Sequence, residues 1–258
     1  MKRTMALVAA LLSLGALACA QEAAGERIVV PARDGARPRL VDVSALNGSI
    51  TVKSYSGKDV IVETEGARLA EEPAPGGMRR IDAPRGLEVR EEDNTITVKL
   101  DPPAFRNLAI SVPADTSLKL KSTHGGIMVE GVSGEVEAKT LNGQVTMTGI
   151  SGTVVADSLN GAIKVTIDRV DPAKPMSFSS LNGSIDVTVP ADTKANLKMR
   201  TDRGQIYSDF EIAMAPNGAA ANRQKGLRSD RTMYGTINGG GPEISFRTLN
   251  GKINIRKK

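Results

Sequence analysis

The tripeptide Leu-Asn-Gly occurs five times in this chain, and no other feature limits the fold as strongly. In each copy an apolar residue stands two positions after the glycine, and a second one stands four positions after it. A turn that recurs ahead of an alternating strand is typical of repeat architectures, in which each unit packs on its neighbours. Such a chain is first a scaffold, and any chemistry is expected on its outer faces or in inserted loops. The five copies begin at Leu46, Leu141, Leu159, Leu181 and Leu249.

The middle of the chain sets the period of the repeat. Five glycines between residues 125 and 161 follow one another at intervals of nine residues. Gly143 and Gly161 follow asparagine, whereas Gly134 and Gly152 follow serine. The true repeat is therefore eighteen residues long, with two strands and two different corners. Because apolar and mostly polar residues alternate after each glycine, each strand is expected to bury one face.

Two architectures compete for this pattern. Asn-Gly between alternating strands is also a strong hairpin signal, so an antiparallel β meander or sandwich is the alternative. A meander gives no reason for the corner type to alternate, and we therefore favour an all-β β-solenoid, a stack of two-strand rungs. Glycine with positive φ is expected at the sharp reversals, and the leucine before each Asn-Gly is expected to face the core. The residues assigned to structural turns are Asn47, Gly48, Gly125, Gly134, Asn142, Gly143, Gly152, Asn160, Gly161, Asn182, Gly183, Gly204, Asn250 and Gly251.

The first twenty residues are expected to be a signal peptide and not part of the fold. Lys2 and Arg3 precede an apolar run over residues 5–18, which is too short to span a bilayer comfortably. Residues 18–20 then fit a small-x-small cleavage site, which predicts export to the periplasm or cell envelope. In the alternative, Cys19, the only cysteine, becomes the lipidated N-terminus of an outer-membrane lipoprotein.

Residues 21–258 are expected to form a single β-solenoid domain. Two insertions interrupt the period, one near residues 66–86 and one near residues 211–235. A hairpin is predicted over residues 87–100, with its turn at Asp93-Asn94. Long inserts on solenoids are the usual place for recognition.

The composition argues against several classes of function. Without Lys2 and Arg3 the formal net charge falls from +5 to +3, an excess too small to indicate nucleic-acid binding. Tryptophan is absent, and Phe and Tyr total seven, so stacking surfaces for single-stranded nucleic acid or sugars are not expected. Membrane contact is expected only through a lipid on Cys19.

No arrangement in the sequence indicates catalysis, a cofactor or a metal site. His124, the only histidine, occupies a corner position at which other repeats carry asparagine. Catalysis by a Ser-His-Asp triad, or binding of zinc, would need that histidine beside suitable partners. In the eighteen-residue frame Lys164 stacks on Asp186 and Lys139 stacks on Asp157. These pairs indicate devices that fix strand register, and we therefore predict that the protein is not an enzyme.

A set of motifs in phase carries a resemblance to a known family. The set comprises the Leu-Asn-Gly units, the Val-Pro-Ala-Asp-Thr segments at 112–116 and 189–193, and the closing segment 239–255. Over most of residues 41–255 the chain resembles a widespread bacterial family of unknown function described as putative adhesins. The resemblance implies a β-solenoid in the bacterial envelope and brings no catalytic residues.

Three functions are considered in order of preference. The first is a noncatalytic exported envelope protein, an adhesin-like binding or structural module whose partner is an envelope or surface protein or a glycan. The second is an envelope-stress or regulatory component that acts through a protein partner. The third is a polysaccharide-active β-helix enzyme, which the scarcity of aromatic residues and the missing acid pair disfavour.

Overall fold

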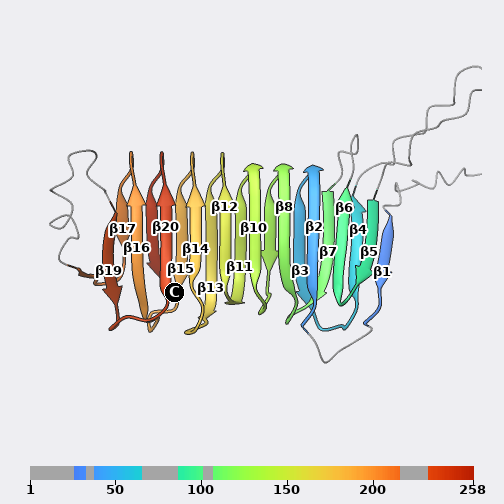
Figure 1. Cartoon of the computed structure of the whole chain (residues 1–258), viewed down its shortest axis with the longest axis horizontal. Coiled ribbons are helices and arrows are strands. Elements are labelled where there is room, and N and C mark those ends of the chain that lie inside the picture. The colour runs from blue at the N-terminus through green and yellow to red at the C-terminus, as the bar shows by residue number, and fades with distance from the viewer. Residues whose placement is uncertain (1–25, 33–37, 66–86, 101–106, 216–231) are drawn as a thin grey trace, which may run out of the picture.

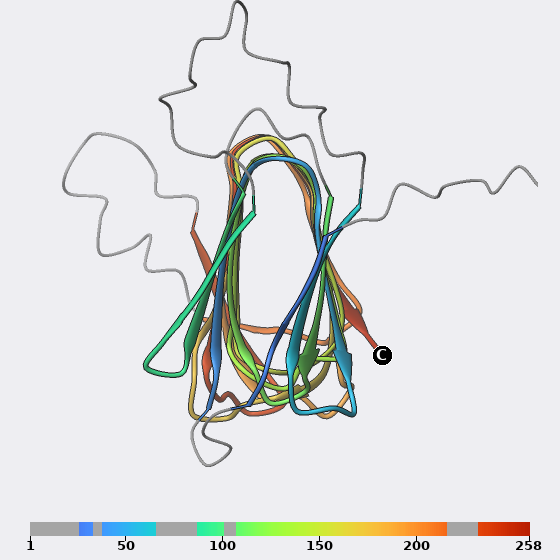
Figure 2. The ribbon, with the colours of Figure 1, turned by 90° about the vertical axis from the view of Figure 1, so that its right-hand side faces the viewer.

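The computed structural model describes residues 26–32, 38–65, 87–100, 107–215 and 232–258. These residues form two large β-sheets that face each other and enclose one apolar core (Figures 1 and 2). Viewed end-on, the two sheets are the long walls of a flattened tube (Figure 2). The predicted all-β solenoid is confirmed. None of the described residues forms a helix that could cross a membrane.

Each sheet is described here in spatial order, which differs from sequence order. Sheet A consists of β1 (Arg27–Val30), β4 (Val60–Glu65), β7 (Asn107–Pro113), β3 (Ile50–Tyr55), β9 (Ile127–Glu130), β11 (Val145–Gly152), β13 (Ile163–Val170), β15 (Ile185–Val189), β21 (Ile253–Lys257) and β17 (Ile206–Ser208). Sheet B consists of β18 (Ala213–Met214), β19 (Met233–Ile237), β16 (Ala195–Thr201), β20 (Glu243–Thr248), β14 (Met176–Ser180), β12 (Val154–Ser158), β10 (Val136–Asn142), β8 (Ser117–His124), β2 (Leu40–Asn47), β6 (Thr95–Leu100) and β5 (Leu87–Glu92).

Parallel pairing in the expected register builds the central rungs. Val136 of β10 lies between Leu118 of β8 and Val154 of β12, each eighteen residues away in the sequence. The predicted neighbours Lys164 and Asp186 are also register partners. A meander would pair these strands antiparallel, so it does not describe the centre of the fold. Antiparallel strands occur at the ends, where β4, β5 and β19 join the stack.

The stacking order departs from the sequence order at both ends of the solenoid. The rung made of β20 and β21 lies between the β14–β15 rung and the β16–β17 rung. Figure 1 shows this as red β20 beside orange β16. At the other end, the β2–β3 rung lies between the β6–β7 rung and the β8–β9 rung. The last and the first rungs of the sequence are therefore interior members of the stack.

The core is filled by the two apolar positions of each strand. Val136 and Ala138 of β10, for example, are buried, whereas the residues between and after them reach the surface. Two aromatic side chains lie at the centre of the C-terminal half, where the rings of Phe178 and Phe246 stack 5.4 Å apart. Fully burying a side chain of this size stabilises the fold by about 1.5–3 kcal/mol. The core is thus a continuous column shared by all rungs.

The structure confirms one predicted irregular segment and describes the two ends of another. The hairpin over residues 87–100 is formed by β5 and β6, and Asp93 and Asn94 take positive φ at its turn (47° and 61°). The insertion expected near residues 211–235 has strands of sheet B at its two ends. There β18 and β19 pair with each other, and β19 also pairs antiparallel with β16, because that strand would otherwise leave an open sheet edge. The predicted signal peptide, Cys19 and residues 66–86 lie outside the described residues.

Candidate functional site

The Leu-Asn-Gly corners stack into one narrow edge of the solenoid, the arched edge at the top of Figure 2. A Cβ placed on Gly143 would overlap the carbonyl oxygen of Gly125, and one on Gly161 would overlap that of Gly143. Among the corner glycines of this edge, only Gly48 has positive φ (107°). The expectation that these glycines serve to reach positive φ is therefore confirmed at Gly48 and wrong at the others. They are needed because successive backbones approach too closely for any side chain.

A row of hydroxyl groups, on four buried residues and the half-buried Thr201, lies directly beneath the corners. Each hydroxyl belongs to the residue three positions before a corner glycine, and it donates a hydrogen bond to the glycine carbonyl of the neighbouring rung. The bonds run from Thr140 to Gly125 (3.2 Å), Ser158 to Gly143 (3.0 Å), Ser180 to Gly161 (3.0 Å), Thr248 to Gly183 (3.1 Å) and Thr201 to Gly251 (3.1 Å). The row satisfies carbonyl groups that the corner would otherwise leave unpaired.

Replacing Ser158 by alanine should lower the free energy of unfolding by about 1–2 kcal/mol, because the Gly143 carbonyl loses a buried donor. Ser122 provides the matched control, since it occupies the same position in another rung. Its buried hydroxyl has no hydrogen-bond partner in the described part of the chain. Ser122→Ala should therefore be neutral or slightly stabilising. Urea unfolding of both variants measures the difference, and equal losses would contradict the assigned role.

An asparagine ladder runs along the outside of the same corners. The Nδ2 of Asn160 donates to Oδ1 of Asn142 (2.9 Å), and Asn182 donates to Asn160 in the same way (2.8 Å). Asn250 continues the ladder by donating to Asn182 (2.7 Å). His124 occupies the next position beyond Asn142, between that residue and Asn47. The amides mostly bond one another, so they hold the corners in line and offer few free donors to a ligand.

The five leucines of the repeats form an exposed row beside this ladder, which we call the leucine ridge. Leu46, Leu141, Leu159, Leu181 and Leu249 are each 36–43% exposed. The expectation that they face the core is wrong. The residue before each leucine is the buried Ala45 or one of the buried hydroxyl residues, and strand alternation then turns the leucine outward. Among the described corners, Thr123 and Asp202 hold the same position in rungs that lack leucine.

The sequence contains a signal for this arrangement that the repeat alone did not reveal. Four of the five Leu-Asn-Gly units are preceded by serine or threonine, and the fifth is preceded by alanine. A small residue that can donate a hydrogen bond, placed where the apolar alternation requires an inward residue, indicates a buried hydroxyl. That inference would have assigned the leucine to the outer surface.

A column of basic residues runs along sheet B beside the leucine ridge, two residues before each ridge position. We call it the basic column, and in stacking order it reads Lys99, Ser44, Lys121, Lys139, Asp157, Ser179, Arg247 and Arg200. Lys99, Lys121 and Arg247 form no ion pair with the described residues. On sheet A, by contrast, Lys53 pairs with Glu130 (3.2 Å) and Arg256 pairs with Asp186 (2.9 Å). Lys164 and Arg169 of sheet A also form no ion pair with the described residues, so the distinction of sheet B is that its three such cations stand in one column beside the ridge.

Charges at the middle of the basic column influence one another. Lys139 forms an ion pair with Glu137, and this bond raises the pKa of the lysine and lowers the pKa of the glutamate. Asp157 is the register partner of Lys139. Partial burial raises the pKa of Asp157, an effect that Lys139 opposes and Glu137 reinforces. The ionised Asp157 carboxylate is therefore disfavoured in the folded protein.

Asp157→Asn should stabilise the protein slightly at pH 7, by up to about 0.5 kcal/mol. A pKa that is higher in the folded state means that wild-type stability falls as pH rises through the folded pKa. The advantage of the variant should therefore be full at neutral pH and vanish below the ordinary pKa of 3.8. Asp186→Asn, which breaks the pair with Arg256, should instead destabilise at neutral pH. Melting curves across pH test the prediction, and a loss of stability in Asp157→Asn at pH 7 would refute it.

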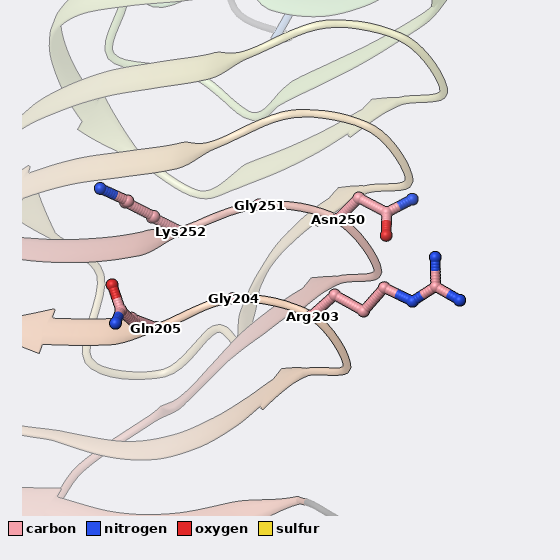
Figure 3. Close-up of a pocket in the computed structure, with 6 residues that line it drawn as sticks. All are labelled: Arg203, Gly204, Gln205, Asn250, Gly251 and Lys252. Atoms are coloured by element: carbon pink, nitrogen blue, oxygen red, sulfur yellow. The ribbon is translucent and has the colours of Figure 1, made fainter.

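A shallow groove lies at the C-terminal end of this edge, shown in Figure 3. It has a volume of about 510 Å³ and is lined by Arg203, Gly204, Gln205, Asn250, Gly251 and Lys252. Arg203 and Asn250 project from adjacent corners (Figure 3). Among the residues that the structure describes, no group of three His, Cys, Asp or Glu side chains could hold a metal ion. The predicted turn residues lie at corners of the stack, and three of them, Gly204, Asn250 and Gly251, line this groove.

The stacked rungs and the exposed ridge define the class of this protein: a flattened β-solenoid that presents one repetitive edge. A family model described as Toastrack DUF4097 matches residues 40–256. The chain therefore belongs to the Toastrack family, which confirms the resemblance to a family of unknown function. A search of curated proteins gave no match.

Two solved structures are similar over nearly the whole chain. One is a putative cell adhesion protein from Clostridium sporogenes, which is 11% identical with a TM-score of 0.38. That comparison covers 91% of this chain and 100% of the other. The second is a putative adhesin from Bacteroides fragilis, also 11% identical, with a TM-score of 0.32 and coverage of 90% and 97%.

Proposed function

We propose that this protein is a noncatalytic, exported binding module of the bacterial cell envelope, adhesin-like in function. The observation that carries the proposal is the leucine ridge, in which five leucines remain 36–43% exposed, four of them at successive corners and Leu46 beyond the Thr123 corner. Contiguous apolar surface of this kind marks interaction sites on soluble proteins. The basic and apolar features of the leader at residues 1–20 support export.

The construction of the edge supports a binding role over a merely structural one. Its stability comes from the stacked glycines, the hydroxyl row and the asparagine ladder, which all lie beneath or beside the leucines. Thr123 and Asp202 show that the corner accepts polar residues at the ridge position. Leucine is therefore not required by the fold there, and its recurrence favours contact with a partner.

Binding to isolated cell envelopes tests the proposal. The triple variant Leu141→Thr, Leu159→Thr and Leu181→Thr uses the residue that already stands at position 123. It should sediment with envelopes at least about tenfold more weakly than wild type, equivalent to a loss of about 1.4 kcal/mol. A control triple, Val29→Thr, Met128→Thr and Tyr207→Thr, removes similarly exposed apolar groups from sheet A and should bind normally. Equal binding by the ridge triple and wild type would refute the proposal.

A further inference from the structure

We propose that the leucine ridge and the basic column together dock the solenoid onto the surface of an anionic phospholipid membrane. This inference rests on the proposed binding function of the ridge and names its partner. It differs from the lipid-anchored contact considered for Cys19, because the folded solenoid itself supplies the contact.

The shape of the ridge fits a soft surface. The leucines project from a narrow convex edge, as the end-on view in Figure 2 shows for the corners that carry them. Neighbouring rungs of a sheet lie about 4.8 Å apart, so the row from Leu46 to Leu249 extends over about 24 Å. The asparagine ladder holds the corners in line. A straight convex row can enter the headgroup region to one depth along its length, as the apolar stripe of an amphipathic helix does.

The charge beside the ridge fits anionic headgroups. Lys121 and Arg247 belong to rungs of the ridge edge and point to the same side of sheet B as the leucines. With Lys99 they form no ion pair in the described part of the chain, although Lys99 is the register partner of Glu88 and the charge of Lys121 acts on Glu137. Apolar groups flanked by Lys and Arg on a single face are the pattern of proteins that bind anionic membrane surfaces. On the opposite face, sheet A, Lys53, Arg27 and Arg256 are paired with acidic side chains, whereas Lys164 and Arg169 form no ion pair with the described residues.

Other partners fit the same edge less well. A glycan would require free hydrogen-bond groups or aromatic surfaces, but the asparagine amides bond one another and the chain has no tryptophan. A peptide in extended form would require an unpaired strand edge or a groove, whereas the strands along the ridge are paired on both sides. A convex apolar row with basic residues on one flank therefore points to lipid.

The absence of tryptophan allows a direct test of which face meets the lipid. In the otherwise unchanged chain, Leu159→Trp places one reporter on the ridge, and Met128→Trp places one on sheet A at similar exposure (39% and 47%). Vesicles of equimolar phosphatidylglycerol and phosphatidylcholine should shift the emission of the Leu159→Trp variant to the blue and leave that of Met128→Trp unchanged. Equal shifts in both variants, or no shift at the ridge, would overturn the proposal.

Vesicle sedimentation measures the contributions of the two features. Changing Lys99, Lys121 and Arg247 to glutamine should weaken binding about 100-fold, because each basic residue near an anionic surface contributes about a factor of five. The ridge triple used above should weaken it at least about tenfold. Raising the salt concentration from about 0.1 M to about 1 M, which shortens the screening length from about 10 Å to 3 Å, should also release the protein. Binding to pure phosphatidylcholine as tight as to the anionic mixture would contradict the charge argument.

The outcomes separate this inference from the proposed function. If the chain binds delipidated envelopes through the ridge but does not bind anionic vesicles, the partner is a protein or glycan, and the inference is wrong while the binding function stands. If the ridge triple binds both envelopes and vesicles like wild type, both proposals fail. Circular dichroism and melting curves of each variant show whether the solenoid is intact. The basic-column variant and the salt series test the inference even if the ridge triple does not fold.

Discussion

Replacing Gly143 by alanine should lower the free energy of unfolding by about 3 kcal/mol, at the upper end of the range for overpacked sites. The added Cβ would overlap the carbonyl oxygen of Gly125 in the neighbouring rung. It would also come within 3.0 Å of the Thr140 hydroxyl, which donates to that same carbonyl. The obstacle is backbone, so no side-chain rotation can relieve it. The rungs must separate locally, and the buried hydrogen bond must lengthen.

Gly126→Ala is the control for this prediction, because it also adds a single Cβ. Gly126 directly follows Gly125, the corner glycine of the neighbouring rung. There the nearest atom to the new Cβ would be the carbonyl oxygen of Gln144, at 3.3 Å. A small shift accommodates that contact, and the loss should stay below about 1 kcal/mol. Urea unfolding gives both values. Similar losses of stability in the two variants would contradict close stacking of the corners as the reason why glycine recurs at this position of the repeat.

Phe178→Ala should cost about 3–5 kcal/mol, the largest effect of a single substitution expected in this chain. Phe178 is fully buried, and its ring stacks on that of Phe246 at 5.4 Å with an angle of 20° between the planes. The two residues come from β14 and β20, strands that are neighbours in the sheet although 68 residues separate them. Removing one ring therefore leaves a cavity where the last rung of the sequence enters the stack.

The position of this cavity predicts which part of the solenoid opens first. Because β20 joins β14 to β16, amide protons of β20 and β16 should lose protection in hydrogen exchange, while those of β8 and β10 should keep it. Phe178→Leu fills most of the volume and should cost less than half as much. Uniform loss of protection along both sheets, or equal costs of the two substitutions, would contradict this account of the C-terminal rungs.

The central rungs of the fold were predictable from local pattern. The nine-residue glycine spacing and the apolar alternation gave the two strands per rung, and they gave neighbours such as Lys164 and Asp186. These predictions succeed because a strand has a fixed two-residue periodicity and stacked corners repeat the same geometry. The predicted positive φ at the corner glycines was wrong except at Gly48, since close stacking of the backbones can require glycine without it.

The candidate site was less predictable. Leucine at a turn was expected in the core because it is apolar, but Leu141 follows the buried Thr140 and must therefore point outward. The preceding Ser or Thr was a readable signal of this orientation. The basic column could not be recognised from the net charge of the chain, because a small excess of +5 becomes a surface feature only when strands far apart in the sequence are stacked. The composition also does not show which basic side chains are paired with acids, as Lys53 and Arg256 of sheet A are in the structure.

The sequence by itself determined the repeat, the two sheets and the buried apolar positions that follow each corner glycine, because these depend on interactions within a rung and between equivalent positions. Only the tertiary structure decided the order of the rungs. Any strand with the same alternation can pair with β14, so periodicity does not distinguish β16 from β20 as its neighbour. The choice of β20 depends on the fit of Phe246 against Phe178 and on the antiparallel strand β19, which covers the outer edge of β16. Such long-range packing and edge protection arise only when the whole chain is assembled.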